Sequence, residues 1–173
     1  DEILWLSDEA ELPDCAPVTV PSVEDHPITI FSSYRGTSAD LIALAHEYGH
    51  AVQFSVSERD FIPPVEREIA AFLAEHIVLE YARLTDVVFS DQLEDVWLNE
   101  TNRYLDADSR SLLAALSRPD SPYSYRHNYP LARIIAAKLY ASKNKESVKS
   151  VFEGRLNISS QLGAPVNTES CIA

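Results

Sequence analysis

The stretch from Leu41 to Gln53 is apolar on almost every side, yet it contains two histidines and a glutamate. We expect a buried helix here, because so few of its residues can face water. His46 and His50 are four residues apart and therefore lie on one face of that helix, where both imidazoles can bind the same Zn²⁺. Glu47 comes directly after the first histidine. Its carboxylate is expected beside the metal, in position to take a proton from a zinc-bound water.

The residues around the histidines favour a metal site over a chance match. The pattern H-E-x-x-H also occurs by chance in helices whose histidines are solvated. Here the helix is apolar before and after the motif, so its imidazoles are buried and need polar partners. A shared metal ion is one solution, and hydrogen bonds to the backbone are the alternative. Gly49 costs ~1 kcal/mol relative to alanine inside a helix, so we expect another element to approach closely there.

A second helix is expected to supply the third ligand. Pro63-Pro64 is a typical helix start, and the sequence from Val65 to Leu79 is strongly apolar. Zinc sites with two histidines need a further ligand, which a glutamate of a neighbouring helix often provides. Glu68 is the candidate. It follows His50 by 18 residues, which lets the first helix end and the chain return antiparallel. The alternative is that Glu68 is an ordinary surface acid.

Two other acids of this helix compete with Glu68. Glu66 is next to Arg67 and is expected to face solvent. Glu75 is two turns after Glu68 on the same helical face, where it is better placed to hydrogen-bond a ligating histidine than to bind the metal.

We therefore predict one Zn²⁺ per chain, held by the two histidines and Glu68, and released at acidic pH as the histidines become protonated.

The rest of the chain predicts a mainly α fold with a small β-sheet, an α+β architecture. Residues 27–34 alternate apolar and small polar types, as a half-buried strand does. Thr37 or Ser38 is expected to cap the histidine helix, which should run to about Ser55. The other expected segments are an irregular lead-in at 1–26 with short β-like pieces at 3–6 and 18–20, helices at 91–106, 109–116, 130–142 and 146–152, and a loose tail at 157–173.

Composition narrows the class of protein. The length of 173 residues fits a single domain over 1–173. Acidic residues outnumber basic ones by 27 to 14, and the resulting net charge of −13 argues against nucleic acid as a partner. No apolar run is long enough to cross a membrane, so we expect no membrane contact and a soluble, cytoplasmic protein. Cys15 and Cys171 could pair or remain free thiols.

Several motifs together are similar to one known family. Pro27 to Thr37, followed by Leu44 to Val52, matches the order of a strand, a Gly-Thr turn and a zinc helix. Glu68 and Glu75 have the spacing of a glutamate helix, and Arg-His-Asn-Tyr-Pro at 126–130 is similar to a later segment with His and Tyr. In these respects the chain resembles the thimet oligopeptidase and oligoendopeptidase F family of zinc metallopeptidases, which are of the gluzincin type. The resemblance is clear over residues 27–80 and weak over 123–140.

The resemblance implies a zincin-like catalytic core and a peptidase that acts on short peptides. It also implies that His127 and Tyr129 bind the oxyanion, although packing is the alternative role for both. Family members are several times longer and enclose their site between two helical halves. We therefore expect either a minimal stand-alone peptidase or a catalytic subunit whose cleft is completed by a partner chain or a second copy.

Two hypotheses for function are open at this point. The first is a zinc metallopeptidase in which Glu47 deprotonates the water and then protonates the leaving amine, with the peptide substrate lying along residues 28–34. The second is a regulatory or interaction module whose zinc is structural. Glu47 favours the first hypothesis, because a structural zinc site has no need of a general base.

Overall fold

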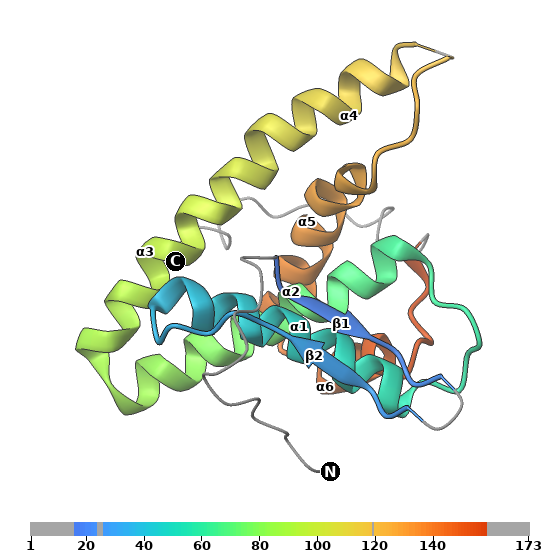
Figure 1. Cartoon of the computed structure of the whole chain (residues 1–173). Coiled ribbons are helices and arrows are strands. Elements are labelled where there is room, and N and C mark those ends of the chain that lie inside the picture. The colour runs from blue at the N-terminus through green and yellow to red at the C-terminus, as the bar shows by residue number, and fades with distance from the viewer. Residues whose placement is uncertain (1–15, 24–25, 119, 159–173) are drawn as a thin grey trace.

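The computed structural model describes residues 16–23, 26–118 and 120–158. This part of the chain is mainly helical and contains a two-stranded antiparallel sheet, which confirms the expected α+β class (Figure 1). The elements in chain order are β1 (Val18–Val20), β2 (Thr29–Phe31), α1 (Ser38–Val56), α2 (Pro64–Thr85), α3 (Val87–Arg103), the π-helical η1 (Tyr104–Asp108), α4 (Ser109–Leu116), the 3-10 helix η2 (Tyr125–His127), α5 (Asn128–Ala141) and α6 (Lys145–Phe152).

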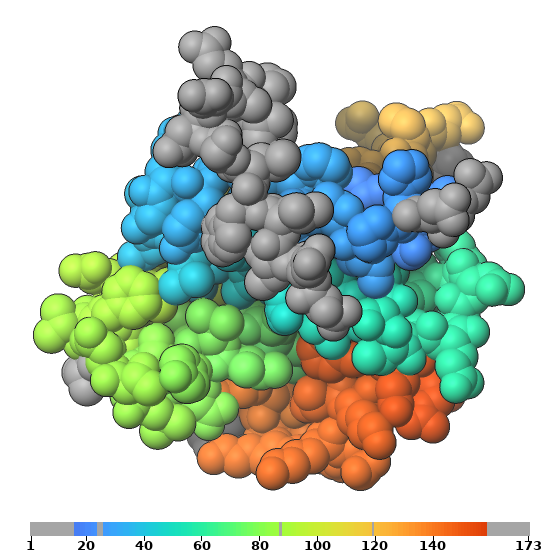
Figure 2. Space-filling view, turned by 60° about the horizontal axis from the view of Figure 1, so that its bottom comes forward, coloured from blue at the N-terminus to red at the C-terminus, as the bar shows by residue number. Residues whose placement is uncertain are grey.

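Helix α2 is the centre of the fold. Its residues from Ile69 to Leu73 are fully buried, and most of them pack with side chains of α5 and α6 such as Ile135. Further along α2, Leu79 joins Ile42 of α1 and Leu93 of α3 in a second cluster. In the space-filling view the α2–α3 segment (green) and the α5–α6 segment (orange) adjoin on one face (Figure 2). An apolar helix surrounded by others is what the composition of 65–79 predicts.

A capping box sets the start of α1. The Thr37 hydroxyl accepts a hydrogen bond from the backbone N–H of Asp40 (3.1 Å), and the Asp40 carboxylate accepts one from the N–H of Thr37 (3.0 Å). Gly36 precedes the cap with a φ of +80°, a left-handed conformation that glycine adopts without strain. The predicted start of the histidine helix is confirmed, and its end at Val56 agrees with the expected one.

Helices α1 and α2 touch at Gly49. A Cβ built on Gly49 would lie 2.7 Å from the Cα of Ala71 and 2.8 Å from the carbonyl oxygen of Ala70. Both distances are well below the separation of non-bonded atoms in a packed core, so only a residue without a side chain fits. The predicted close approach at Gly49 is confirmed. It brings the histidine face of α1 directly against α2.

Gly49→Ala is expected to lower the free energy of unfolding by roughly 1–3 kcal/mol, because the two backbones must separate to admit the methyl group. The better helix propensity of alanine, worth ~1 kcal/mol, offsets only part of this. Urea unfolding measures the change. The matched control is Ser55→Ala, at an exposed position of the same helix, where the expected change is below about 0.5 kcal/mol. A Gly49→Ala variant as stable as the wild type would contradict the tight contact.

The sheet is shorter than predicted but in the predicted place. β1 corresponds to the β-like piece expected at 18–20, and Val18 pairs with Phe31 while Val20 pairs with Thr29. β2 covers only the middle of the strand expected at 27–34, because β1 offers no further partners for the ladder. Both strands pack on α1 (Figure 1). This packing places Thr19, the middle residue of β1, against the helix that carries the histidines.

The helices of the second half differ from prediction at their boundaries. α3 begins at Val87 rather than at 91, with Asp86 as its N-cap. α3 then continues through the π-helical turn of η1 into α4, so the two separate helices expected at 91–106 and 109–116 form one long rod (Figure 1). No proline or glycine interrupts this stretch, which is why the rod can continue.

Helix α5 begins at Asn128, two residues before the predicted start at Pro130. Proline is tolerated there because the first turn of a helix has N–H groups without intrahelical partners. No helix in the described ranges is long and apolar enough to cross a membrane. The β-like piece expected at 3–6, both cysteines and the end of the tail from 159 onward lie outside the described residues.

Candidate metal centre

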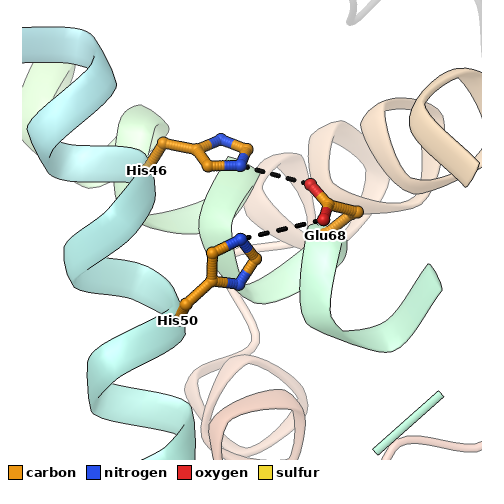
Figure 3. A group of neighbouring side chains, drawn as sticks. All are labelled: His46, His50 and Glu68. Carbon is orange, nitrogen blue, oxygen red and sulfur yellow. Dashed lines mark ion pairs between the residues drawn. The ribbon is translucent and has the colours of Figure 1, made fainter. Parts of the chain in front are cut away.

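Two imidazoles of α1 and one carboxylate of α2 converge on a common point. In Figure 3 the rings of His46 and His50 both point from α1 toward Glu68. Nε2 of His46 is 3.2 Å from Oε2 of Glu68, and Nε2 of His50 is 3.7 Å from Oε1. In a tetrahedral zinc site with bonds of ~2.1 Å, neighbouring ligand atoms are about 3.4 Å apart. Both nitrogen–oxygen distances are close to this value, so the three residues could hold a zinc ion.

The charges of this group also favour a cation. Burial lowers the pKa of His46, but the carboxylates of Glu68 and Glu75 outweigh burial and raise it to about 10. Burial, together with the nearby His46, lowers the pKa of His50 to about 4. Burial alone would raise the pKa of Glu68, yet the adjacent His46 lowers it on balance. A proton on His46 thus compensates the buried carboxylates, and a bound metal ion would replace that proton.

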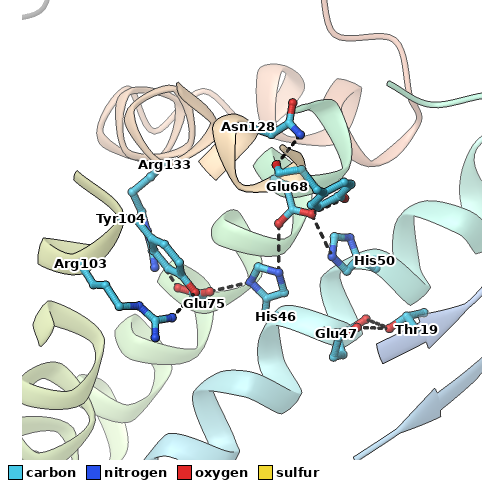
Figure 4. A network of polar contacts seen from close by, with 11 residues as sticks. Thr19, His46, Glu47, His50, Glu68, Glu75, Arg103, Tyr104, Asn128 and Arg133 are labelled. Carbon is cyan, nitrogen blue, oxygen red and sulfur yellow. Dashed lines mark hydrogen bonds and ion pairs between the residues drawn. The ribbon is translucent and has the colours of Figure 1, made fainter. Parts of the chain in front are cut away.

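Glu75 contacts His46 on the other ring nitrogen. Oε1 of Glu75 is 2.8 Å from Nδ1 of His46. Figure 4 shows this contact, through which the carboxylate orients the ring with Nε2 toward Glu68. The contact is the one expected of Glu75 from its helical spacing. Oε2 of Glu75 accepts a hydrogen bond from Arg133 of α5 (2.5 Å). Such outer contacts hold metal-binding histidines in one tautomer and orientation.

Sequence reasoning missed Arg133. Its side chain is 2% exposed, pairs with Glu75, and has its guanidinium 4.0 Å from the centre of the Phe72 ring. The sequence could have indicated this role, because Arg133 is the one charged residue in the otherwise apolar stretch from Leu131 to Ala136. A buried cation on an apolar helix face needs a buried acid as partner.

Glu47 borders the metal group without belonging to it. It is 8% exposed, and its Oε2 lies 2.7 Å from the hydroxyl of Thr19 in β1. The same hydroxyl is 2.8 Å from the main-chain oxygen of Glu47, and its single proton can serve only one of them at a time. Oε1 of Glu47 makes no hydrogen bond with any described residue, so it can accept a proton from water. Sequence reasoning missed Thr19, which is 28 positions away from Glu47.

A pocket of about 280 Å³ opens beside this group. Two tyrosines reach it. The hydroxyl of Tyr125 donates a hydrogen bond to Oε1 of Glu68 (2.6 Å). Burial and the Glu68 charge raise the pKa of Tyr125 well above its usual range, and raise that of Tyr129 to about 12, so both hydroxyls keep their protons. The pocket is lined by Pro17, Val18, Thr19, His46, Glu47, His50, Phe54, Arg67, Glu68, Tyr125 and Tyr129.

The structure brings Tyr129 to the pocket but not His127. Nε2 of His127 is 3.3 Å from the Ser111 hydroxyl of α4, and its Nδ1 accepts the backbone N–H of Ser124 (3.3 Å). His127 lines a separate hollow beside α4. Sequence reasoning also missed Tyr125, which lies one helical turn before Tyr129. The spacing Tyr-x-x-x-Tyr could have indicated that both side chains lie on the same side.

Glu66 does not face solvent, and that prediction was wrong. The residue is 7% exposed, and its carboxylate pairs with Arg59 at 2.7 Å. The same nitrogen of Arg59 donates to the carbonyl oxygen of Gly154, which follows α6. The segment after α6 therefore helps to cover the beginning of α2. Among the residues that the structure describes, the group that could hold a metal consists of His46, His50 and Glu68.

Comparison with family models, with curated proteins and with solved structures finds no significant match for the chain. The likeness to the oligopeptidases therefore rests on the motifs alone. Any function has to be argued from the geometry of the site.

Proposed function

We propose that this chain is a zinc-dependent metallopeptidase that hydrolyses short or unstructured peptides, with a zincin-like core. One observation carries the proposal. Glu47 lines the same pocket as His46, His50 and Glu68, but it is not a member of the metal-binding group. A zinc site that serves only to stabilise a fold uses all its positions for protein ligands and has no role for such a carboxylate.

In the proposed peptide hydrolysis, the metal and the side chains of the protein have different roles. Zinc, when bound, would supply Lewis acidity that lowers the pKa of water and polarises a peptide carbonyl. Glu47 accepts the proton of the attacking water through Oε1 and passes it to the leaving amine. The Tyr129 hydroxyl, which makes no hydrogen bond with any described residue, donates to the carbonyl oxygen as it becomes negative. A donor of this kind is worth about 2.7–4 kcal/mol in the transition state.

An extended substrate is expected beside β1 rather than along 28–34. β1 and the residue before it contribute Pro17, Val18 and Thr19 to the pocket, whereas β2 contributes none. Within the described ranges, β1 pairs on one side only, with β2. A peptide could therefore add to the other edge of β1 as a further strand, with its scissile bond near Glu47.

Removal of the metal provides the test. The zinc-loaded chain should cleave a pool of unstructured peptides, chelation should abolish cleavage, and one equivalent of Zn²⁺ should restore it. Mass spectrometry of the products measures the activity, and the His46→Ala variant, given the same zinc, is the control. Tight binding of one zinc without cleavage at any protein concentration would favour the zinc-binding module. Activity only at high protein concentration would point to a cleft completed by a second copy.

A further inference from the structure

Arg67 is the one arginine or lysine among the residues that line the pocket, and no described acidic residue forms an ion pair with it. It belongs to the first turns of α2, next to Glu68, and it lines the pocket together with His50 and Tyr125. Its Nε is buried and makes no hydrogen bond, and its side chain forms no ion pair with any described residue. Its guanidinium lies 5.8 Å from the centre of the Tyr125 ring, which is a cation–π contact.

This lack of a partner sets Arg67 apart from most arginines of the chain. In a protein with a net charge of −13, an arginine finds a carboxylate easily. A buried donor without a hydrogen-bond partner costs free energy, so the unpaired Nε of Arg67 lowers the stability of the fold. Seven other arginines form an ion pair with a glutamate or aspartate in the described part of the chain, namely Arg59, Arg83, Arg103, Arg110, Arg126, Arg133 and Arg155.

Since no described carboxylate pairs with Arg67, the pocket leaves its guanidinium free to bind an anionic ligand. Glu68 is adjacent in sequence, but it forms its ion pairs with His46 and His50, and its Oε1 accepts the hydrogen bond of Tyr125. A guanidinium matches a carboxylate with two parallel hydrogen bonds, and its flat face can still rest on an aromatic ring. The pocket is small, so a carboxylate bound there belongs to a residue close to the scissile bond.

We infer that Arg67 binds a carboxylate of the substrate, and that the site selects peptides with a negative charge near the bond to be cleaved. This inference rests on the proposed peptidase function, because the ligand is taken to be a peptide substrate. Its test measures binding and does not require peptidase activity. The carboxylate could be the C-terminus of the peptide or an Asp or Glu side chain. The strongly negative charge of the whole chain repels acidic peptides, so any such preference must come from a local cation.

Binding can be measured without turnover in a Glu47→Gln background. Four fluorescent peptides of one sequence are compared by fluorescence polarisation with the zinc-loaded chain: free acid or amide at the C-terminus, each with Glu or Gln at one internal position. We expect tighter binding of either the free acids or the Glu peptides, which identifies the carboxylate that is recognised. Adding Arg67→Gln should weaken binding of the preferred peptides about 10- to 100-fold and remove the preference.

Two further variants distinguish specific binding of the peptide carboxylate by Arg67 from a general effect of the positive charge. Arg67→Lys keeps the charge but not the paired hydrogen bonds, and should restore only part of the preference. Arg118→Gln removes the same charge from an exposed arginine that does not line the metal pocket, and should leave all four affinities unchanged. Zinc content, measured for every variant, shows whether the metal is retained.

Two results would overturn the inference: equal affinity of the Glu47→Gln chain for all four peptides, or a uniform loss for all four when Arg67 is replaced. The second result would make Arg67 a residue that supports the site as a whole. A clear preference that depends on Arg67, in a chain whose wild type cleaves nothing, would leave the carboxylate site standing while the peptidase proposal fails.

Discussion

Glu47→Gln is expected to retain zinc and fold stability but to lose peptidase activity by about 10²- to 10⁴-fold, the usual contribution of a general base. Glutamine has nearly the same shape as glutamate and can still accept the hydrogen bond from Thr19. It cannot take a proton from water. The metal group is untouched, because Glu47 is not one of its members.

Three measurements on the same preparation test this expectation: zinc content, urea unfolding and cleavage of the peptide pool. The matched control is Glu58→Gln, an exposed acid just after α1, which should cleave as fast as the wild type. Equal cleavage by the Glu47→Gln variant and the wild type would show that the activity does not use this site. Loss of zinc from the variant would mean that Glu47 is a ligand rather than a base.

Glu68→Gln should weaken zinc binding more than Glu75→Gln does, because an amide replaces a negatively charged ligand in the first case. Glu75 acts through Nδ1 of His46, and losses of such outer contacts typically cost 10- to 100-fold in metal affinity. Competition with a chromogenic chelator ranks the two variants. The reverse order would make Glu75 the ligand, in conflict with its contact to Arg133.

In the metal-free protein, Glu75→Gln should lower the free energy of unfolding more than Glu68→Gln does. Glu75→Gln leaves the buried guanidinium of Arg133 without its counter-charge, and breaking a buried pair in this way costs about 3–5 kcal/mol. In the metal-free protein, Glu68→Gln removes a smaller share of the compensation, because His46 still has Glu75. Urea unfolding of both metal-free variants measures the difference. Equal stability would show that Arg133 finds another partner.

The local part of the site follows from helix periodicity. His46 and His50 lie on one face because they are four residues apart. Glu47 directly follows His46 and therefore lies to the side of that face. The capping box at Thr37 sets where α1 begins, and Pro63 and Pro64, at the N-cap and first position of α2, set where α2 begins. Gly49 indicated that another element approaches closely, but the sequence did not show which element it is.

The non-local part was decided by how α2 lies against its neighbours. The sequence by itself determined the coarse fold class, the two site helices and the residues at helical spacing, since these depend on contacts a few positions apart. Only the tertiary structure placed Thr19, Tyr125 and Arg133 at the site, 28, 57 and 58 positions from their respective partners. It also placed His127 beside a separate hollow, and it placed Arg67 in the pocket with no ion pair to any described residue. Such placements depend on side-chain packing between elements far apart in the chain, which periodicity does not encode.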